Sequence, residues 1–164
     1  MTDRDLPANA SRRDLDRWFA VELNNQIWDL IDNGLSDQSP RADQDRALYG
    51  AYAAAYHWLQ AGTVANHGRA EHLIATVAAV TGRLQTAREH AARLQQLIAD
   101  DLAAFADWDR AAAAEVVARV AARSADPAAG DLRAAAQGLA DHVAGPEERQ
   151  ICRERLAAPP WSPA

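Results

Sequence analysis

Residues 70–98 read AEHLIATVAAVTGRLQTAREHAARLQQLI, and this stretch decides the fold. Apolar side chains recur at helical spacing on both sides of one turn, Thr81-Gly82. Two apolar stripes separated by a single glycine are typical of two antiparallel helices that pack on each other. We therefore expect Gly82 to adopt a left-handed turn conformation. The side chains that we expect to be buried in this hairpin are Leu73, Ile74, Val77 and Leu94.

The same helical pattern extends through most of the chain, and no stretch alternates apolar and polar residues as a strand would. The sequence therefore predicts an all-α fold of stacked antiparallel helical hairpins, an α-solenoid. We expect the hairpins near residues 12–61, 64–101 and 107–144. A short helix at 147–157 is predicted to cap the stack.

Residues with special backbone or capping preferences set these boundaries. Ser11 followed by Asp14 resembles a capping box at the first helix, and Asn33-Gly34 is typical of a helix end. We expect residues 11–157 to form a single domain after a disordered arm at 1–10. The tail at 158–164, rich in proline and containing a tryptophan, is predicted to be non-helical and to leave Trp161 able to fold back onto the helices.

The composition excludes several classes of function. All 17 basic residues are arginine, so no Schiff-base or P-loop lysine exists, although coding bias explains the arginine excess well enough. A net charge of −6 argues against nucleic acid as a partner. No apolar run is long enough to span a membrane, and the N-terminus has no hydrophobic signal region. We therefore expect a cytoplasmic protein that does not bind membranes.

The stretch 70–97 resembles a tetratricopeptide repeat (TPR). Aligning Gly82 with the loop glycine of that motif puts Ile74 and Ala75 on its large-small pair, and Ala87 on the small residue where the two helices cross. The chain departs from the motif at three positions that prefer aromatic residues: Glu71, Ala78 and Ala91. No proline closes the unit. Residues 103–144 match only in outline, and 12–61 by hairpin length alone.

The whole chain also resembles a group of uncharacterised bacterial repeat proteins. They have a Tyr-His-Trp-Leu stretch before an Ala-Gly-Thr turn, which falls here at residues 56–63. Both resemblances imply a fold and no particular activity.

Polar and aromatic residues interrupt the alanine-rich background in two places. On the first helix, Glu22, Asn25 and Trp28 are spaced three apart, off the main apolar stripe. A second group surrounds the turn before the third helix: His57, Trp58, Asn66, His67, Arg69, Glu71 and His72. In a repeat array the first helix of each hairpin lines the concave surface. These residues, His72 excepted, are therefore our nine-residue candidate ligand-binding site, between the first and third helices. The alternative is that the tryptophans fill gaps between helices and the polar groups are solvated.

We considered metal binding and catalysis at the same place. His67 and Glu71 are four residues apart on one helix face, and with His57 they would make a two-histidine, one-carboxylate set. No standard metal motif is present, so a solvated histidine–glutamate pair is the simpler interpretation and we expect neither metal nor cofactor. No serine lies in a Gly-x-Ser-x-Gly elbow, and the single Cys152 is best read as a packed thiol. Catalytic residues are left unassigned.

The fold analogy favours binding of a partner peptide or protein in the concave groove. The alternative is a small enzyme, or a protein that binds a small polar ligand, in a bacterial biosynthetic pathway. A third hypothesis is a structural oligomerisation module, because the alanine run 111–114 would also suit packing against a second copy.

Overall fold

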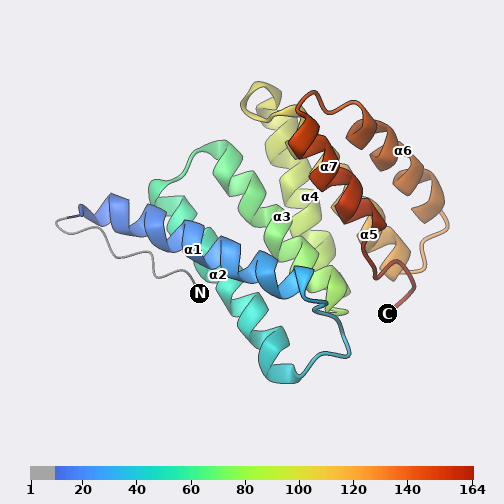
Figure 1. Ribbon diagram of the computed structural model, residues 1–164, viewed down its shortest axis with the longest axis horizontal. Coiled ribbons are helices and arrows are strands. Elements are labelled where there is room, and N and C mark those ends of the chain that lie inside the picture. Colours follow the sequence, from blue (N-terminus) through green and yellow to red (C-terminus); the bar gives the residue numbers. More distant parts are fainter. Residues whose placement is uncertain (1–9) are drawn as a thin grey trace.

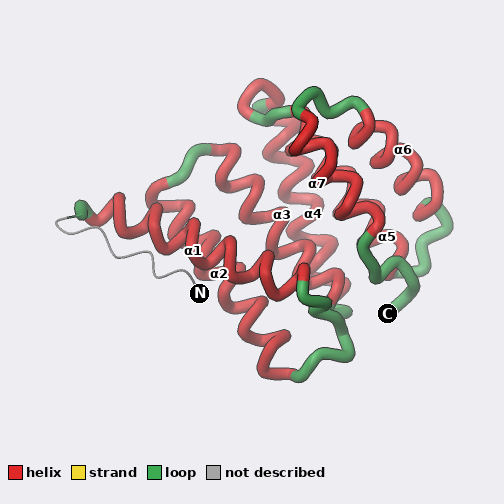
Figure 2. The backbone as a smooth tube through the Cα atoms, in the orientation of Figure 1, coloured by secondary structure: helices red, strands yellow, loops and turns green. Residues whose placement is uncertain are grey.

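The computed structural model describes residues 10–164, and in this part of the chain all regular structure is helical (Figures 1 and 2). The prediction of an all-α fold is therefore confirmed. Residues 1–9 of the expected N-terminal arm lie outside the described residues. The helices are α1 Arg12–Asp32, α2 Arg41–Ala61, α3 Val64–Val80, α4 Leu84–Asp100, the 3-10 helix η1 Leu102–Ala104, α5 Asp107–Arg123, α6 Ala129–Asp141 and α7 Pro146–Ala157.

Helices that follow each other along the chain pack together in pairs. α1 packs on α2, α3 on α4, and α5 on α6. The pairs also touch, because α2 contacts α3 and α4 contacts α5, while α1, α3 and α5 contact one another in sequence. α7 folds back onto α5 and α6, and in the view of Figure 1 it lies between α3 and α6.

The central pair α3–α4 forms the core. Leu73, Ile74, Val77 and Leu94 are all buried, as their positions in the apolar stripes predicted. Gly82 has a φ of +76°, which favours glycine and lets the chain reverse within the three-residue turn between these helices. Every residue of α3 from 73 to 80 is buried, since α3 contacts helices on both sides.

The helix ends follow the local capping signals. Ser11 and Asp14 form the expected capping box at α1: the Asp14 N–H donates to Ser11 Oγ and the Ser11 N–H donates to Asp14 Oδ2. Gly34, with a φ of +89°, follows the end of α1. Thr63 and Asn66 form a second capping box at the start of α3. These ends agree closely with the boundaries that the sequence predicted.

The tail at 158–164 is held against the helices by arginines. Arg119 donates from Nη1 to the carbonyl oxygens of Ala158 and Pro160, both at 3.1 Å. The indole of Trp161 lies against two guanidinium groups, with the Cζ of Arg119 at 4.4 Å and the Cζ of Arg133 at 4.1 Å from the ring centroid. Trp161 therefore folds back onto the molecule.

Candidate functional site

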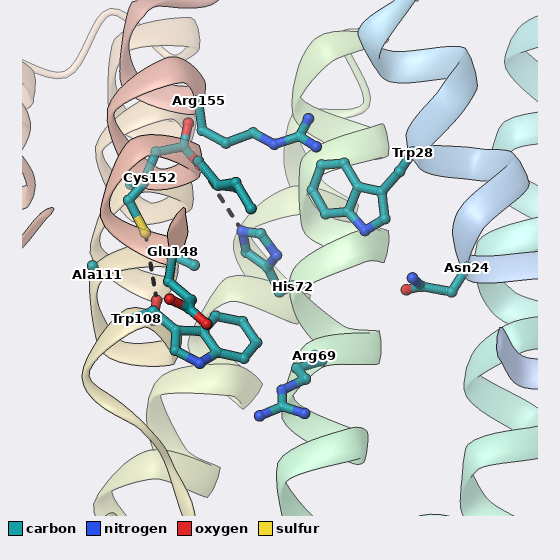
Figure 3. A pocket seen from close by; sticks show the side chains of 12 residues that line it. Asn24, Trp28, Arg69, His72, Trp108, Ala111, Glu148, Cys152 and Arg155 are labelled. Carbon is teal, nitrogen blue, oxygen red and sulfur yellow. Dashed lines mark hydrogen bonds and ion pairs between the residues drawn. The ribbon is translucent and has the colours of Figure 1, made fainter. Parts of the chain in front are cut away.

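A cavity of about 340 Å³ lies between α1, α3, α5 and α7. Figure 3 shows Trp28 of α1 on one side of it, Cys152 and Arg155 of α7 on the other, and Arg69 and His72 of α3 between them. Its volume falls in the range of roughly 300–1,000 Å³ that is usual for small-molecule sites. A second cavity, of about 460 Å³, adjoins the first, and Glu115, Ile151 and Arg155 line both.

Two indole rings form walls of the first cavity, and each already contacts a guanidinium group. The Cζ of Arg155 lies 3.8 Å from the centroid of Trp28, and that of Arg69 lies 4.4 Å from the centroid of Trp108. The His72 imidazole adds a third ring, with its centroid 5.6 Å from that of Trp28. Because cations are attracted to indole faces, these walls suit a flat or positively charged group.

Arg69 is held in place by α5. Its Nε and Nη2 donate to the two carboxylate oxygens of Asp109 at 2.8 and 3.0 Å. Asp109 is buried and also accepts a hydrogen bond from the N–H of Ala106 at 3.0 Å, which caps α5. The Arg69 guanidinium is therefore both neutralised and fixed against Trp108 by a bidentate pair.

Glu115 is the buried charge on α5 that lines both cavities. Its side chain is only 4 % exposed, and its Oε1 accepts a hydrogen bond from Arg119 Nε at 2.7 Å. Its Oε2 is 3.9 Å from His72 Nε2, too far for a direct hydrogen bond. His72 Nε2 is itself buried and has no hydrogen-bond partner among the described residues. Burial alone would raise the pKa of Glu115, but the His72 imidazole and the Arg119 guanidinium lower it below the ordinary glutamate value. The carboxylate is therefore ionised at neutral pH.

Arg155 links the two ends of the molecule across the cavities. From α7 its Nη1 donates to Oδ1 of Asp32, at the end of α1, at 2.7 Å, while its guanidinium stacks on Trp28. Asp32 is 59 % exposed and Arg155 is 24 % exposed. This single side chain joins α7 to α1 where the two cavities meet.

Of the nine residues proposed from the sequence, Trp28 and Arg69 line the first cavity, and the other seven do not. On α1, Glu22 and Asn25 lie off the lining, and the neighbouring Asn24 contributes instead. Trp58 packs with Ala20 and Ala70 in a small apolar cluster. This agrees with the alternative prediction that tryptophans fill gaps between helices. The Asn66 side chain is used in the cap of α3.

The remaining three proposed residues have separate partners, so the two-histidine, one-carboxylate set is not formed. His57 Nδ1 is 2.7 Å from Asp16 Oδ1, and His67 Nε2 is 3.1 Å from a backbone oxygen of α2, that of Trp58. Glu71 faces α4, where its Oε2 is 2.5 Å from His90 Nδ1. Although His67 and Glu71 both lie on α3, the His67 side chain contacts α2 and the Glu71 side chain contacts α4. Within residues 10–164 no group of three or more histidine, cysteine, aspartate or glutamate residues could hold a metal ion.

Besides Asn24 on α1 and His72 on α3, the lining residues outside the nine predicted from the sequence come from α5 and α7. Trp108 and Glu115 lie on α5, whose alanine and valine content suggested only packing, and Arg155 lies on the expected capping helix. One signal was available: Glu115 and Arg119 are four apart on a helix that is otherwise nearly all apolar at their level. A buried ion pair on such a face would have pointed toward a functional site.

Cys152 lines the cavity but is poorly suited to thiolate chemistry. Its Sγ lies 3.9 Å from the carbonyl oxygen of Trp108 and its side chain is buried. Burial, together with the nearby carboxylate of Glu115, raises the pKa of the Cys152 thiol, so the nucleophilic thiolate is disfavoured. This agrees with the interpretation of Cys152 as a packed thiol.

None of the described helices is long and apolar enough to cross a membrane. Comparison of the chain with known protein families, curated proteins and solved structures found no match. A function must therefore be argued from the cavity itself.

Proposed function

We propose that this protein is a TPR-like helical-repeat protein that binds a small organic molecule in the cavity between α1, α3, α5 and α7. Support for the repeat arrangement comes from three successive helix pairs and from the central turn at Gly82, whose φ is +76°. Ala87, aligned with the crossing position of the repeat motif, is fully buried. Ile74 and Ala75, the large-small pair, are buried as well.

The observation that carries the binding proposal is the composition of the cavity wall. Two indole rings from helices that are far apart in the sequence, Trp28 and Trp108, line one space together with the ionised carboxylate of Glu115. Apolar walls with a few fixed polar groups are the usual design of small-molecule sites. A buried charge that leaves one oxygen without a hydrogen bond costs stability, and such a cost is common where a ligand supplies the missing partner.

The position of α7 favours a small ligand over a peptide. In an open groove a peptide would lie along α1, α3 and α5, but here α7 packs on α5 and Arg155 spans from it to Asp32. A peptide would have to displace this contact and the stacking of Arg155 on Trp28. A molecule that fits about 340 Å³ would not.

A ligand screen with a cavity-filling variant tests this proposal. Ala112 lines the cavity, so Ala112→Leu should fill part of it. Ala135→Leu, at an exposed position of α6, makes the same chemical change away from the cavity. We expect a library of small organic molecules, followed by thermal shift and by NMR of the tryptophan indole N–H signals, to give binders to wild type and Ala135→Leu that Ala112→Leu loses.

Two results would contradict the proposal. In one, no library member shifts the Trp28 or Trp108 signal. In the other, binders are found but Ala112→Leu retains all of them. Peptides that bind equally well to wild type and Ala112→Leu would instead support the peptide hypothesis.

A further inference from the structure

We propose that the ligand of the cavity is an organic amine, bound as a cation with its ammonium group at Glu115 and Glu148 and its apolar body between Trp28 and Trp108. This inference rests on the proposed function, because it names the ligand class of the same site. Three features of the cavity lead to it: an unfilled buried acceptor, the pairing of the arginines, and the indole faces.

The unfilled acceptor is Oε2 of Glu115. Arg119 directs both Nε and Nη2 at the other oxygen, Oε1, at 2.7 and 2.5 Å. Among the described residues, Arg119 bonds to Oε1 alone and His72 Nε2 stays 3.9 Å from Oε2, although the Glu115 side chain is only 4 % exposed. A carboxylate oxygen has room for two donors, so Oε2 can accept N–H groups of a ligand without losing Arg119.

The arginines that line the cavity are already neutralised. Arg69 is bound bidentately by Asp109, and Arg155 is bound by Asp32 at 2.7 Å. Glu148, an exposed residue in the first turn of α7, also lines the cavity, and none of the ion pairs among the described residues includes it. Figure 3 shows its carboxylate on the Trp108 side. With the pairs Arg69–Asp109, Arg155–Asp32 and Arg119–Glu115 cancelling, Glu148 is the carboxylate of the cavity lining that no arginine neutralises.

The indole walls favour the same ligand class. Trp28 and Trp108 already hold a guanidinium at 3.8 and 4.4 Å from their ring centroids, respectively, which shows that these rings attract cations. A charged amine gains from indole faces and from carboxylates together, whereas a carboxylate ligand would be repelled by Glu115 and Glu148. A neutral ligand would contact the indole rings but would not neutralise the charge of the Glu148 carboxylate.

Three probes that share a phenyl ring and a two-carbon chain but differ in charge test this inference: 2-phenylethylamine, 2-phenylethanol and phenylacetate. Binding is followed on the ¹⁵N-labelled protein by the indole N–H signals, with Trp28 and Trp108 assigned from the Trp28→Phe and Trp108→Phe variants. We expect the amine to bind at least about tenfold more tightly than the alcohol, which corresponds to about 1.4 kcal/mol. Phenylacetate should bind most weakly.

Charge-removing variants locate the effect. Glu148→Gln should weaken binding of the amine about three- to tenfold and leave binding of the alcohol unchanged. Glu147→Gln is the matched control, because Glu147 is also an acidic residue in the first turn of α7 but does not line the cavity. Glu115→Gln should weaken amine binding further. Because Glu115→Gln leaves Arg119 buried without its carboxylate and so threatens folding, Glu148→Gln is the deciding variant.

The two proposals fail in different ways. If the alcohol or phenylacetate binds as tightly as the amine, or if Glu148→Gln and Glu147→Gln have the same effect, the ligand is not an amine, while binding in the cavity stands. If none of the three probes shifts the indole signals but other library members do, the amine class is again refuted and the proposed function is kept. A library without any binder, or one whose binders are all retained by Ala112→Leu, removes both proposals.

Discussion

Replacing Gly68 with alanine should destabilise the protein, although general helix propensity predicts the opposite. Gly68 lies inside α3, where alanine is normally favoured over glycine by about 1 kcal/mol. An added Cβ would lie 2.4 Å from Cε1 and 2.8 Å from Cζ of Phe105. Carbon atoms pack at about 3.5–4.0 Å, so the ring must move by about 1 Å. Phe105 is buried, and overpacking of such sites costs about 1–3 kcal/mol.

The expected net result of Gly68→Ala is a loss of about 0–2 kcal/mol in the free energy of unfolding, measured by urea denaturation. Gly138→Ala is the control, because Gly138 is also in a helix, α6, and an added Cβ meets nothing within 4 Å. That substitution should stabilise by about 0.5–1 kcal/mol. In a Phe105→Leu background, which lacks the ring atoms Cε1 and Cζ, Gly68→Ala should also become stabilising.

The double-mutant cycle between Gly68→Ala and Phe105→Leu isolates the contact, and its coupling energy should be about 1–3 kcal/mol. The reasoning is refuted if Gly68→Ala stabilises the wild type as much as Gly138→Ala does. It is also refuted if the effect of Gly68→Ala is the same in both Phe105 and Leu backgrounds, because the ring would then play no part.

Three further predictions concern the central turn, the core and one ion pair. Gly82→Val should lower the melting temperature clearly, since a β-branched residue is strained at a φ of +76°, and an unchanged melting temperature would contradict this. Leu73→Ala, at a side chain with no exposure, should cost about 2–5 kcal/mol in urea denaturation, and a loss below about 0.5 kcal/mol would mean that the core is misread. The hydrogen bond from Arg123 lowers the pKa of Asp37, so this pair stabilises the fold above the ordinary aspartate pKa of about 3.9 and loses its effect as the pH falls through the lower folded value. The stability difference between wild type and Asp37→Asn, measured by urea denaturation, should therefore be larger at pH 7 than at pH 2, and a difference independent of pH would exclude the mechanism.

The helices could be predicted well from the sequence because their signals are local. The capping box at Ser11 and the glycine turn at Gly82 act within a few residues, and the apolar stripes of α3 and α4 repeat at helical spacing. Such patterns do not depend on which other helices are near. The boundaries of the helices followed directly from them.

The site could be predicted only in part because its groups meet across long sequence separations. Arg69 and Trp28 were identified because they interrupt apolar surroundings, but their partners, Asp109 and Arg155, lie 40 residues or more away. The fold-back of α7 over α5 brings Arg155 to Trp28, and the packing of α5 on α3 brings Asp109 to Arg69. No local pattern specifies either packing. The burial of individual arginines could not be predicted either, because no local sequence pattern distinguishes the buried Arg123 from the exposed arginines of the same chain.

The bond between Arg155 and Asp32 has a consequence for how the molecule unfolds. In a linear array each helix pair touches only its neighbours, so a terminal pair can fray while the rest stays folded. Here α7 is tied to the end of α1, and Arg123 of α5 reaches Asp37 in the loop that follows α1. Opening of the first pair therefore breaks contacts with the last helices as well. The amide hydrogens of α1 and α7 should therefore exchange in concert, whereas in an open row of repeats the terminal helices exchange independently.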